Sequence, residues 1–309
     1  MKTVRQQFAD TMLEVGKADQ DLVVLVSDMS HFLLQPFAQA CPGRFYNLGI
    51  CEQSIVGVAA GLAKLGFKPV IHTMASFLVE RCFEQLKLDF CHQGLGGVLV
   101  ALGGGFDNST LGPTHHCYSD FALMKALPGA RVVYPGSPEE FDSLFRQCYR
   151  DPFLTYFRVP VSQHGVPLSD ITFGQGVKVA PGEHCTIICT GPHLRACLDA
   201  RDILGAEGIS VEVLYIHTIR PLDVPLVLES VARTGRVLVV EDHMDRGGLS
   251  EEVLRVTWGI VGARCDVVAL NGFVAGYGRY EAVSRRLGFS AEGIAERVRR
   301  LTCTRRTLA

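Results

Sequence analysis

The sequence lacks an apolar run long enough to cross a membrane, since its longest apolar stretches reach only the length of a β-strand. It also lacks a strong excess of charge. The formal net charge is −2, and no run of Lys or Arg is long enough to follow a phosphate backbone. Residues 3–18 are amphipathic with charges throughout, unlike the apolar core of a secretion signal. We therefore expect a cytoplasmic protein that neither spans a membrane nor binds nucleic acid.

Closely paired cysteines are also missing. The chain has eleven cysteines, but none is arranged as Cys-x-x-Cys, the usual spacing at a zinc site. Cys185 and Cys189 flank Thr-Ile-Ile in a segment that is typical of a buried strand. Since a free cysteine packs like a small apolar residue, we expect reduced, buried thiols and no metal ligands on this chain.

Short apolar segments alternate with helical patterns through most of the chain. This alternation predicts an α/β fold of two domains, each a mostly parallel sheet covered by helices. The first series predicts helices at 3–18, 52–65, 76–92, 119–126 and 137–150, with strands at 22–27, 68–73, 97–102, 131–134 and 153–157. The second predicts strands at 186–190, 210–215, 236–241 and 265–270, separated by helices at 192–207, 223–233 and 249–259.

One segment interrupts the alternation. Residues 159–182 contain three Pro and four Gly, a composition typical of a connection between domains. We therefore predict a first domain over residues 1–160, a linker over 161–181 and a second domain over 182–309.

The segment 44–66 contains the most informative single residue. A short strand and a glycine turn precede a helix over 52–65 that is apolar or small almost all round, with Glu52 in its first turn. A helix without a polar face should be buried on all sides, and a buried carboxylate is costly unless it is hydrogen-bonded. Glu52 should therefore have a specific partner. The small residues of this helix favour packing against another subunit, with a tightly packed internal helix as the alternative.

The order of the motifs resembles the transketolase-like enzymes. Asp28 is followed by NLGICEQSIVGVAAGLA, HTMASFLVERCFEQ and LGPTHHCYSDFALMKALPGARVVYPGSPEE, as in the pyrimidine-binding domain of that family. After the linker, TGPHLRACLDARDIL, YIHTIRPLD and LVVEDHMDRGGLSEEV resemble its C-terminal domain. The spacing Phe77-x-x-x-Arg81-x-x-x-Gln85 looks most like the separate C-terminal subunits of split transketolases.

The resemblance implies thiamine diphosphate as the cofactor. The family holds the diphosphate through Mg²⁺ with a Gly-Asp-Gly motif, and this sequence has no Gly-Asp-Gly. The chain thus resembles half an enzyme, which supplies the pyrimidine side of the site. A separate N-terminal-type subunit carrying Gly-Asp-Gly would hold the diphosphate and the metal. The resemblance further implies an α2β2 assembly and a sugar phosphate substrate.

Four residues match family positions that bind the cofactor. Glu52 matches the glutamate that hydrogen-bonds the pyrimidine nitrogen N1′ and favours the imino form of the ring, so it is a candidate catalytic residue. Phe77 matches the aromatic residue that stacks on the pyrimidine, with an ordinary core position as the alternative. Asp28 and Met29 match positions that face the thiazolium ring across the subunit interface.

Four residues match positions that contact the substrate. His115, in Gly-Pro-Thr-His, matches a histidine near the reacting carbonyl and is the second catalytic candidate. His116 takes a position where the family usually has Gln. Arg5 and Arg158 match positions that bind the sugar-phosphate tail, a role that suits the planar guanidinium group. For each arginine a surface ion pair is the alternative.

Two departures from the family pattern affect the expected substrate. Leu111 replaces a usual Asp, and Gly103 replaces a usual His; in the family these two groups read sugar hydroxyls. Because a site that pairs hydroxyls discriminates strongly, their loss argues against ordinary pentose-phosphate activity. We expect transfer of a two-carbon ketol or acyl unit with non-standard specificity, in a specialised biosynthetic pathway.

Two other functions are compatible with the sequence. The beta subunit of a 2-oxo acid dehydrogenase shares the two-domain layout, but the Gly-Pro-Thr-His region and the Phe77–Gln85 spacing favour a transketolase. A non-catalytic subunit that stabilises or regulates its partner is the third possibility, and the presence of Glu52 argues against it.

Overall fold

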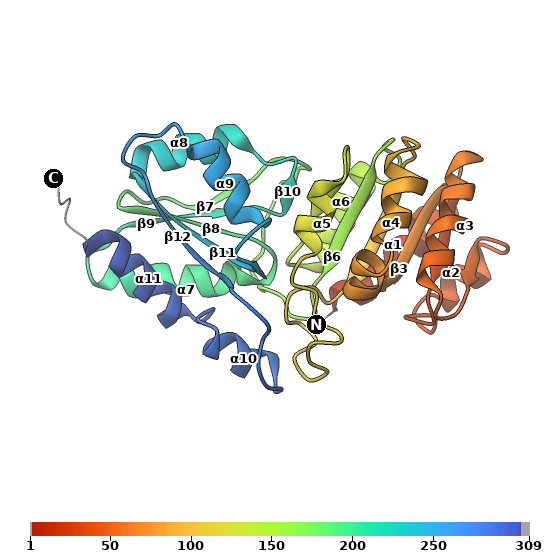
Figure 1. Cartoon of the computed structure of the whole chain (residues 1–309), viewed down its shortest axis with the longest axis horizontal. Coiled ribbons are helices and arrows are strands. Elements are labelled where there is room, and N and C mark those ends of the chain that lie inside the picture. The colour runs from red at the N-terminus through yellow and green to blue at the C-terminus, as the bar shows by residue number, and fades with distance from the viewer. Residues whose placement is uncertain (1, 304–309) are drawn as a thin grey trace.

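Two sheets lie side by side along the long axis of the molecule, each with helices on both faces (Figure 1). The computed structural model describes residues 2–303, so residues 1 and 304–309, at the outer ends of the two predicted domains, lie outside the described residues. The predicted α/β fold class is confirmed. Among the described residues, no helix is both long and apolar enough to span a membrane.

Seven strands form the first sheet, in the order β10-β5-β6-β4-β3-β1-β2. All neighbouring strands are parallel except β10, which pairs with β5 in the antiparallel direction. The strands are β1 (Leu22–Val26), β2 (Phe45–Asn47), β3 (Lys68–Met74), β4 (Gly97–Leu102), β5 (Arg131–Val133), β6 (Leu154–Val159) and β10 (Thr218–Arg220). The second half of the chain thus adds one edge strand to this sheet.

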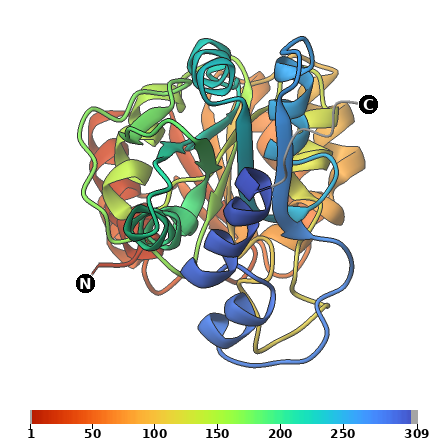
Figure 2. The same cartoon turned by 90° about the vertical axis from the view of Figure 1, so that its left-hand side faces the viewer.

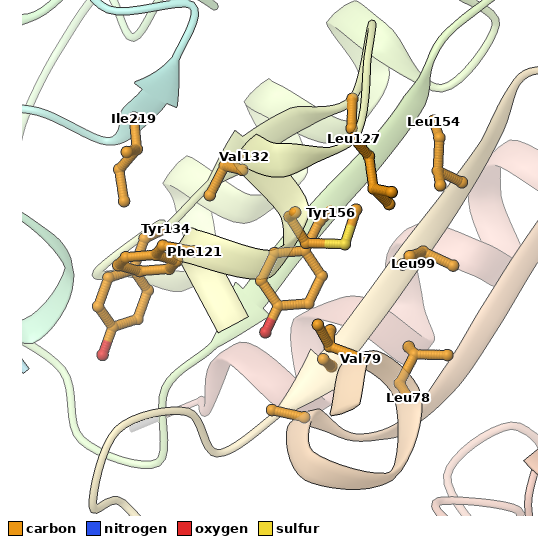
Figure 3. Close-up of a cluster of buried hydrophobic side chains, with 14 of the residues drawn as sticks. Leu78, Val79, Leu99, Phe121, Leu127, Val132, Tyr134, Leu154, Tyr156 and Ile219 are labelled. Atoms are coloured by element: carbon orange, nitrogen blue, oxygen red, sulfur yellow. The ribbon is translucent and has the colours of Figure 1, made fainter. Parts of the chain in front are cut away.

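Helices cover both faces of the first sheet because its strands are apolar on both sides. On one face lie α1 (Val4–Ala18), α2 (Gln35–Ala40) and α6 (Pro138–Cys148). The other face carries α3 (Glu52–Lys64), α5 (Asp120–Ala126) and the segment 76–92, for which the sequence predicts one helix. That segment is instead two π-helical turns, η1 (Ser76–Glu80) and η2 (Leu86–Cys91), separated by α4 (Phe83–Gln85). Figure 3 shows Leu78 and Val79 of η1 in the core beneath this face.

Five strands form the second sheet, in the order β12-β11-β8-β9-β7. It is parallel except for the edge pair β7 and β9. The strands are β7 (Val177–Ala180), β8 (Cys185–Cys189), β9 (Val211–Tyr215), β11 (Arg236–Met244) and β12 (Arg264–Leu270). Because β7 lies within the predicted linker 161–181, the irregular connection is shorter than the sequence indicates.

Two pairs of helices cover the second sheet, one on each face (Figure 1). The pair α7 (Leu194–Ala206) and α11 (Ala291–Cys303) packs on one face, and α8 (Val224–Thr234) and α9 (Leu249–Thr257) pack on the other. The short elements η3 (Gly191–His193) and α10 (Tyr280–Arg286) complete this half. All eleven cysteines are free, and seven of them are buried.

A fully buried arginine joins the two halves of the chain. Arg158, on β6, donates through Nε to Asp120 (2.7 Å) and through Nη1 to Asp242 on β11 (2.9 Å). The Tyr134 hydroxyl also donates to Asp242, at 3.0 Å. A Cβ at Gly104 would lie 2.1 Å from Arg158 Nε, so this close approach requires glycine. Because buried charges are tolerated only when they are paired, the cluster fixes how the two sheets meet.

Asp107 lies beside this cluster and gives the fold a dependence on pH. Its Oδ2 accepts from the Val161 amide (3.0 Å), while its buried Oδ1 has no hydrogen-bond partner among the described residues. Burial, followed by the nearby Asp242 carboxylate, raises the pKa of Asp107 to about 8. An unfolded aspartate ionises near pH ~4. Between these values the folded state alone holds the proton, so this group makes stability fall as pH rises.

We predict that Asp107→Asn changes the free energy of unfolding more favourably at pH 8 than at pH 5, when each value is compared with wild type at the same pH. The group contributes up to ~1.4 kcal/mol per pH unit in this interval, and the amide cannot ionise. Thermal unfolding at pH 5, 6.5 and 8 measures the effect, with the exposed Asp202→Asn as the matched control. Equal pH slopes for wild type and Asp107→Asn would contradict the assignment.

Candidate functional site

The carboxyl ends of three neighbouring parallel strands meet at one edge of the first sheet. Ser27 and Asp28 follow β1, Phe77 comes after β3, and Gly103 follows β4. Ligands of open α/β sheets bind outside the carboxyl ends of strands. The first residue of α3, Glu52, reaches the same edge, because its side chain contacts Ser27.

Glu52 is buried and hydrogen-bonded, as its sequence context predicts. Its side chain is 2% exposed. The Ser27 hydroxyl donates to Oε1 at 2.8 Å, and Arg81 Nη1 donates to Oε2 at 2.6 Å. Each carboxylate oxygen therefore has one protein donor and a further lone pair that can accept another.

Arg81 connects Glu52 to two aromatic rings. Its guanidinium carbon lies 4.2 Å from the centroid of the Phe77 ring, a cation–π distance. Phe77 in turn meets the His115 ring edge-to-face, with centroids 5.4 Å apart. The π-helical turn η1 carries Phe77, and Arg81 follows that turn directly. Such turns are often found at functional sites. Glu52, Arg81, Phe77 and His115 thus form one continuous cluster.

A polar residue that the sequence did not identify supports His115. Asn108 Nδ2 lies 3.4 Å from the carbonyl oxygens of both Gly103 and His115. Gly103 has φ +71°, and a Cβ there would lie 2.4 Å from Asn108 Nδ2. The Asn108 amide therefore fills the space that a side chain at position 103 would need. Leu111, half exposed, follows in the same loop.

Asp28 and Met29 form a tight turn at the end of β1. Asp28 is exposed and has a left-handed backbone (φ +49°), which non-glycine residues rarely adopt. Its amide donates to Asn47 Oδ1 at 3.0 Å, and Asn47 Nδ2 donates back to its carboxylate at 3.2 Å. Met29 is half-buried against the core on the α1 face. The turn leaves the Asp28 carboxylate at the surface of this edge.

Arg5 lies beside the same turn and has no ion-pair partner among the described residues. Its Nε donates to Ser30 Oγ at 2.7 Å, and Ser30 Oγ lies 2.6 Å from His72 Nε2. Burial lowers the pKa of His72 to about 4, so its ring is neutral. Because His72 Nδ1 must donate to the Val100 carbonyl (2.7 Å), its Nε2 accepts from Ser30. Arg5 is therefore oriented by a neutral relay, which leaves its charge uncompensated.

The structure places Arg158 and His116 in the interior of this chain. Arg158 is completely buried between Asp120 and Asp242, so its guanidinium group is already paired and is not part of a surface ion pair. His116 is 3% exposed, and its Nδ1 lies 2.5 Å from the Tyr118 hydroxyl. Both side chains are held by the interior of this chain, which the sequence motifs could not reveal.

One face of α3 is uncovered, contrary to the expectation that this helix is buried on all sides. Gln53, Ser54, Gly57, Val58 and Gly61 are exposed. Large apolar side chains near α2 and α3 are also exposed, namely Phe32 (79%), Ile50 (74%) and Leu65 (77%). Figure 1 shows α2 and α3 at the end of the molecule farthest from the second sheet. The helix α3 is therefore not a tightly packed internal helix of this chain, which was the alternative to packing against another subunit.

The described residues contain no cluster of three His, Cys, Asp or Glu side chains that could hold a metal ion.

Comparison with known proteins gives consistent matches over both halves of the chain. A family model described as "Transketolase, pyrimidine binding domain" matches residues 1–165, and one described as "Transketolase, C-terminal domain" matches residues 174–294. A protein of Phocaeicola vulgatus, named as one of the subunits of an apulose-4-phosphate transketolase, is 32% identical over 261 residues. This match covers 82% of the present chain and 83% of that protein.

Two further similarities extend over nearly the whole chain. The 6-deoxy-6-sulfo-D-fructose transketolase subunit SqwH of a Clostridium species is 28% identical, over 97% of this chain and 94% of that protein. A solved structure titled "Split gene transketolase, inactive beta4 tetramer" superposes with a TM-score of 0.86 at 29% identity, covering 97% of each chain.

The contact between Arg81 and Glu52 has a measurable effect on stability. We predict that Arg81→Ala lowers the free energy of unfolding by about 1–3 kcal/mol, because it removes a donor from a buried carboxylate. Arg246→Ala is the matched control, since Arg246 is 76% exposed and pairs with the neighbouring Asp245; a change within ~0.5 kcal/mol is expected there. Chemical denaturation compares the two, and equal effects would show that Arg81 contributes nothing to holding Glu52.

Proposed function

Since this chain belongs to the transketolase family, we propose that it is the C-terminal-type subunit of a two-subunit, thiamine-diphosphate-dependent transketolase. It would act in the transfer of a two-carbon ketol unit from a ketose phosphate to an acceptor. The observation that carries this proposal is Glu52, a buried carboxylate that Arg81 connects to the Phe77 ring, at the start of a helix whose outer face is uncovered.

The residues at this edge fit the pyrimidine part of the cofactor. Glu52 offers a carboxylate acceptor whose position is fixed by Ser27 and Arg81, and Phe77 offers an aromatic ring for stacking. When bound, thiamine diphosphate supplies the carbanion that attacks a ketose carbonyl. Glu52 would hydrogen-bond the ring nitrogen and hold or release its proton. Asp28 and Met29 would lie on the thiazolium side of the crevice.

A partner subunit completes the site in this proposal. The sequence has no Gly-Asp-Gly, so the diphosphate and Mg²⁺ would be held by an N-terminal-type subunit that carries this motif. Two relatives are themselves named as transketolase subunits, and the related beta4 tetramer is described as inactive. The uncovered face of α3, with Phe32 and Ile50 nearby, would bind the partner in an α2β2 assembly. The free thiols suit a cytoplasmic location.

The substrate is proposed to be a non-standard sugar with one anionic tail. Arg5 supplies an uncompensated positive charge, whereas the Arg158 guanidinium group is already paired with Asp120 and Asp242. Near His115, the apolar Leu111 and the side-chain-free Gly103 replace groups that would read hydroxyls. Relatives named for apulose-4-phosphate and 6-deoxy-6-sulfo-fructose support unusual specificity. We propose that the enzyme acts in a specialised biosynthetic pathway.

We predict that Glu52→Gln lowers the turnover of the complex, reconstituted with a neighbouring-gene Gly-Asp-Gly subunit, by more than ~100-fold. An amide cannot exchange a proton with the pyrimidine nitrogen, and general acid–base catalysis is worth about 10²–10⁴ in rate. Steady-state kinetics with thiamine diphosphate, Mg²⁺ and a panel of ketose phosphates measures this.

Glu84→Gln is the control, because Glu84 is an exposed glutamate on α4, close to Arg81 in sequence. Its turnover should match that of wild type. Near-normal turnover of Glu52→Gln would remove Glu52 from the mechanism, and decarboxylation of pyruvate-type donors with lipoyl acceptors would favour a 2-oxo acid dehydrogenase instead.

A further inference from the structure

A segment of the second half of the chain packs against the loop that carries His115. We call residues 273–279, between β12 and α10, the strap, and residues 105–118 the His115 loop. Figure 2 shows both at the bottom of the molecule, where the blue strap runs beside the yellow loop. The two segments are more than 150 residues apart in sequence, as the separation of 169 between Ser109 and Gly278 shows.

Three hydrogen bonds join the strap to the His115 loop. The Ser109 hydroxyl donates to the Gly278 carbonyl at 2.8 Å, and the Gly278 amide donates to the Ser109 carbonyl at 3.1 Å. The Val274 amide donates to the Tyr118 hydroxyl at 3.1 Å. Ser109 is 3% exposed, so these bonds are shielded from water. The strap therefore binds the loop at both of its ends.

Tyr118 passes the contact on to the histidine next to His115. Because its oxygen accepts from Val274 and no other acceptor for its proton is found among the described residues, the hydroxyl donates to His116 Nδ1, 2.5 Å away. Burial lowers the pKa of His116, which favours the neutral ring that can accept this bond. The Asn108 backbone and the His115 ring also lie close enough to affect this pKa. The strap thus holds the His116 ring in place through Tyr118.

The Tyr277 ring occupies the space that a side chain at position 112 would need, so this position requires glycine. A Cβ at Gly112 would lie 2.2 Å from Tyr277 Cε1, and Gly112 has φ +78°. The Gly112 carbonyl accepts from the His115 amide at 2.9 Å and from the His116 amide at 3.1 Å. Tyr277 therefore packs on the turn that orients His115, although 68% of its surface is exposed.

The strap adds to the contacts that the loop makes within itself. Its base is closed by a pair of backbone bonds between Gly105 and Cys117, at 2.7 and 3.0 Å. Beyond that base, the side-chain bonds of Asn108 within the loop are long, at 3.4 Å. Short backbone bonds hold the turns of the loop, such as that from the His115 amide to the Gly112 carbonyl at 2.9 Å, and the strap adds contacts from outside at Ser109, Gly112 and Tyr118.

We propose that the strap positions His115, with Tyr277 as the main positioning residue, so that the second half of the chain takes part in substrate selection. The consequence for activity rests on the proposed function, whereas the consequence for loop order does not. A displacement of about 1 Å at a reacting group can lower rates up to about a hundredfold.

The kinetic test uses the reconstituted complex with Tyr277→Ala, Tyr277→Phe and Gly112→Ala. We expect Tyr277→Ala and Gly112→Ala each to lower kcat/KM by about tenfold to a hundredfold. The kcat/KM of Tyr277→Phe should stay within about twofold of wild type, because the phenyl ring still packs against Gly112. The double variant with both alanines should be no worse than Gly112→Ala alone, since both disturb one contact. Trp258→Ala, at a 90% exposed aromatic residue elsewhere, is the control.

Hydrogen–deuterium exchange on the full chain alone gives a readout that needs no activity. In Tyr277→Ala the amides of residues 112–116 should exchange faster than in wild type and in Trp258→Ala, while those of β11 stay protected. Unchanged exchange would overturn the proposal whatever the complex catalyses. Faster exchange with unchanged kcat/KM in an active complex would also overturn it. An inactive wild-type complex would count against the proposed function, and exchange would then decide the role of the strap.

Discussion

A single buried carboxylate organises the candidate site. Glu52 is tolerated at 2% exposure because Ser27 and Arg81 donate to its two oxygens. A carboxylate without such donors would be strongly destabilising in this position. The end of β1, the turn η1 and the start of α3 must therefore meet, and Arg81 connects the carboxylate to Phe77 and, through that ring, to His115.

A second buried ionic cluster relates this site to the rest of the chain. Arg158 holds Asp120 of the first half and Asp242 of the second, and it approaches the backbone of Gly104 at the root of the His115 loop. The second half then contacts the far side of that loop through Val274 and Gly278. The loop is thus held from two directions, by a charged cluster beneath it and by the strap beside it. This arrangement gives the second half a physical connection to the site.

Much of the fold could be predicted from the sequence, because strongly apolar strands such as β4 and amphipathic helices such as α6 show clear periodicity. The short strands β7 and β10 were missed, since three or four residues at a sheet edge carry little pattern. The segment 76–92 has helical spacing but forms two π-helical turns, a local choice that periodicity does not distinguish. The prediction that α3 is buried on all sides failed for this chain by itself, because no element of the chain covers its outer face among the described residues.

For the site, motif order identified Glu52, Phe77 and His115, which the structure brings together. It could not identify Arg81 as the partner of Glu52, nor Asn108 as the support of His115, because both contacts depend on how loops return to the sheet edge. It did not indicate that Arg158 pairs with two buried carboxylates, since a strand-end arginine looks alike in sequence whether it faces a ligand or two carboxylates. The role of such an arginine depends on carboxylates from distant elements, here Asp120 and Asp242. The spacing of residues along the sequence does not show which distant residues come close.

The most direct measurement is a crystal structure of the complex of this chain with its Gly-Asp-Gly partner, thiamine diphosphate and Mg²⁺. We predict that a Glu52 carboxylate oxygen lies about 2.6–3.2 Å from the pyrimidine nitrogen, with the partner subunit covering the open face of α3. A cofactor bound away from Glu52, or an α3 face still open to solvent in the assembled complex, would contradict it.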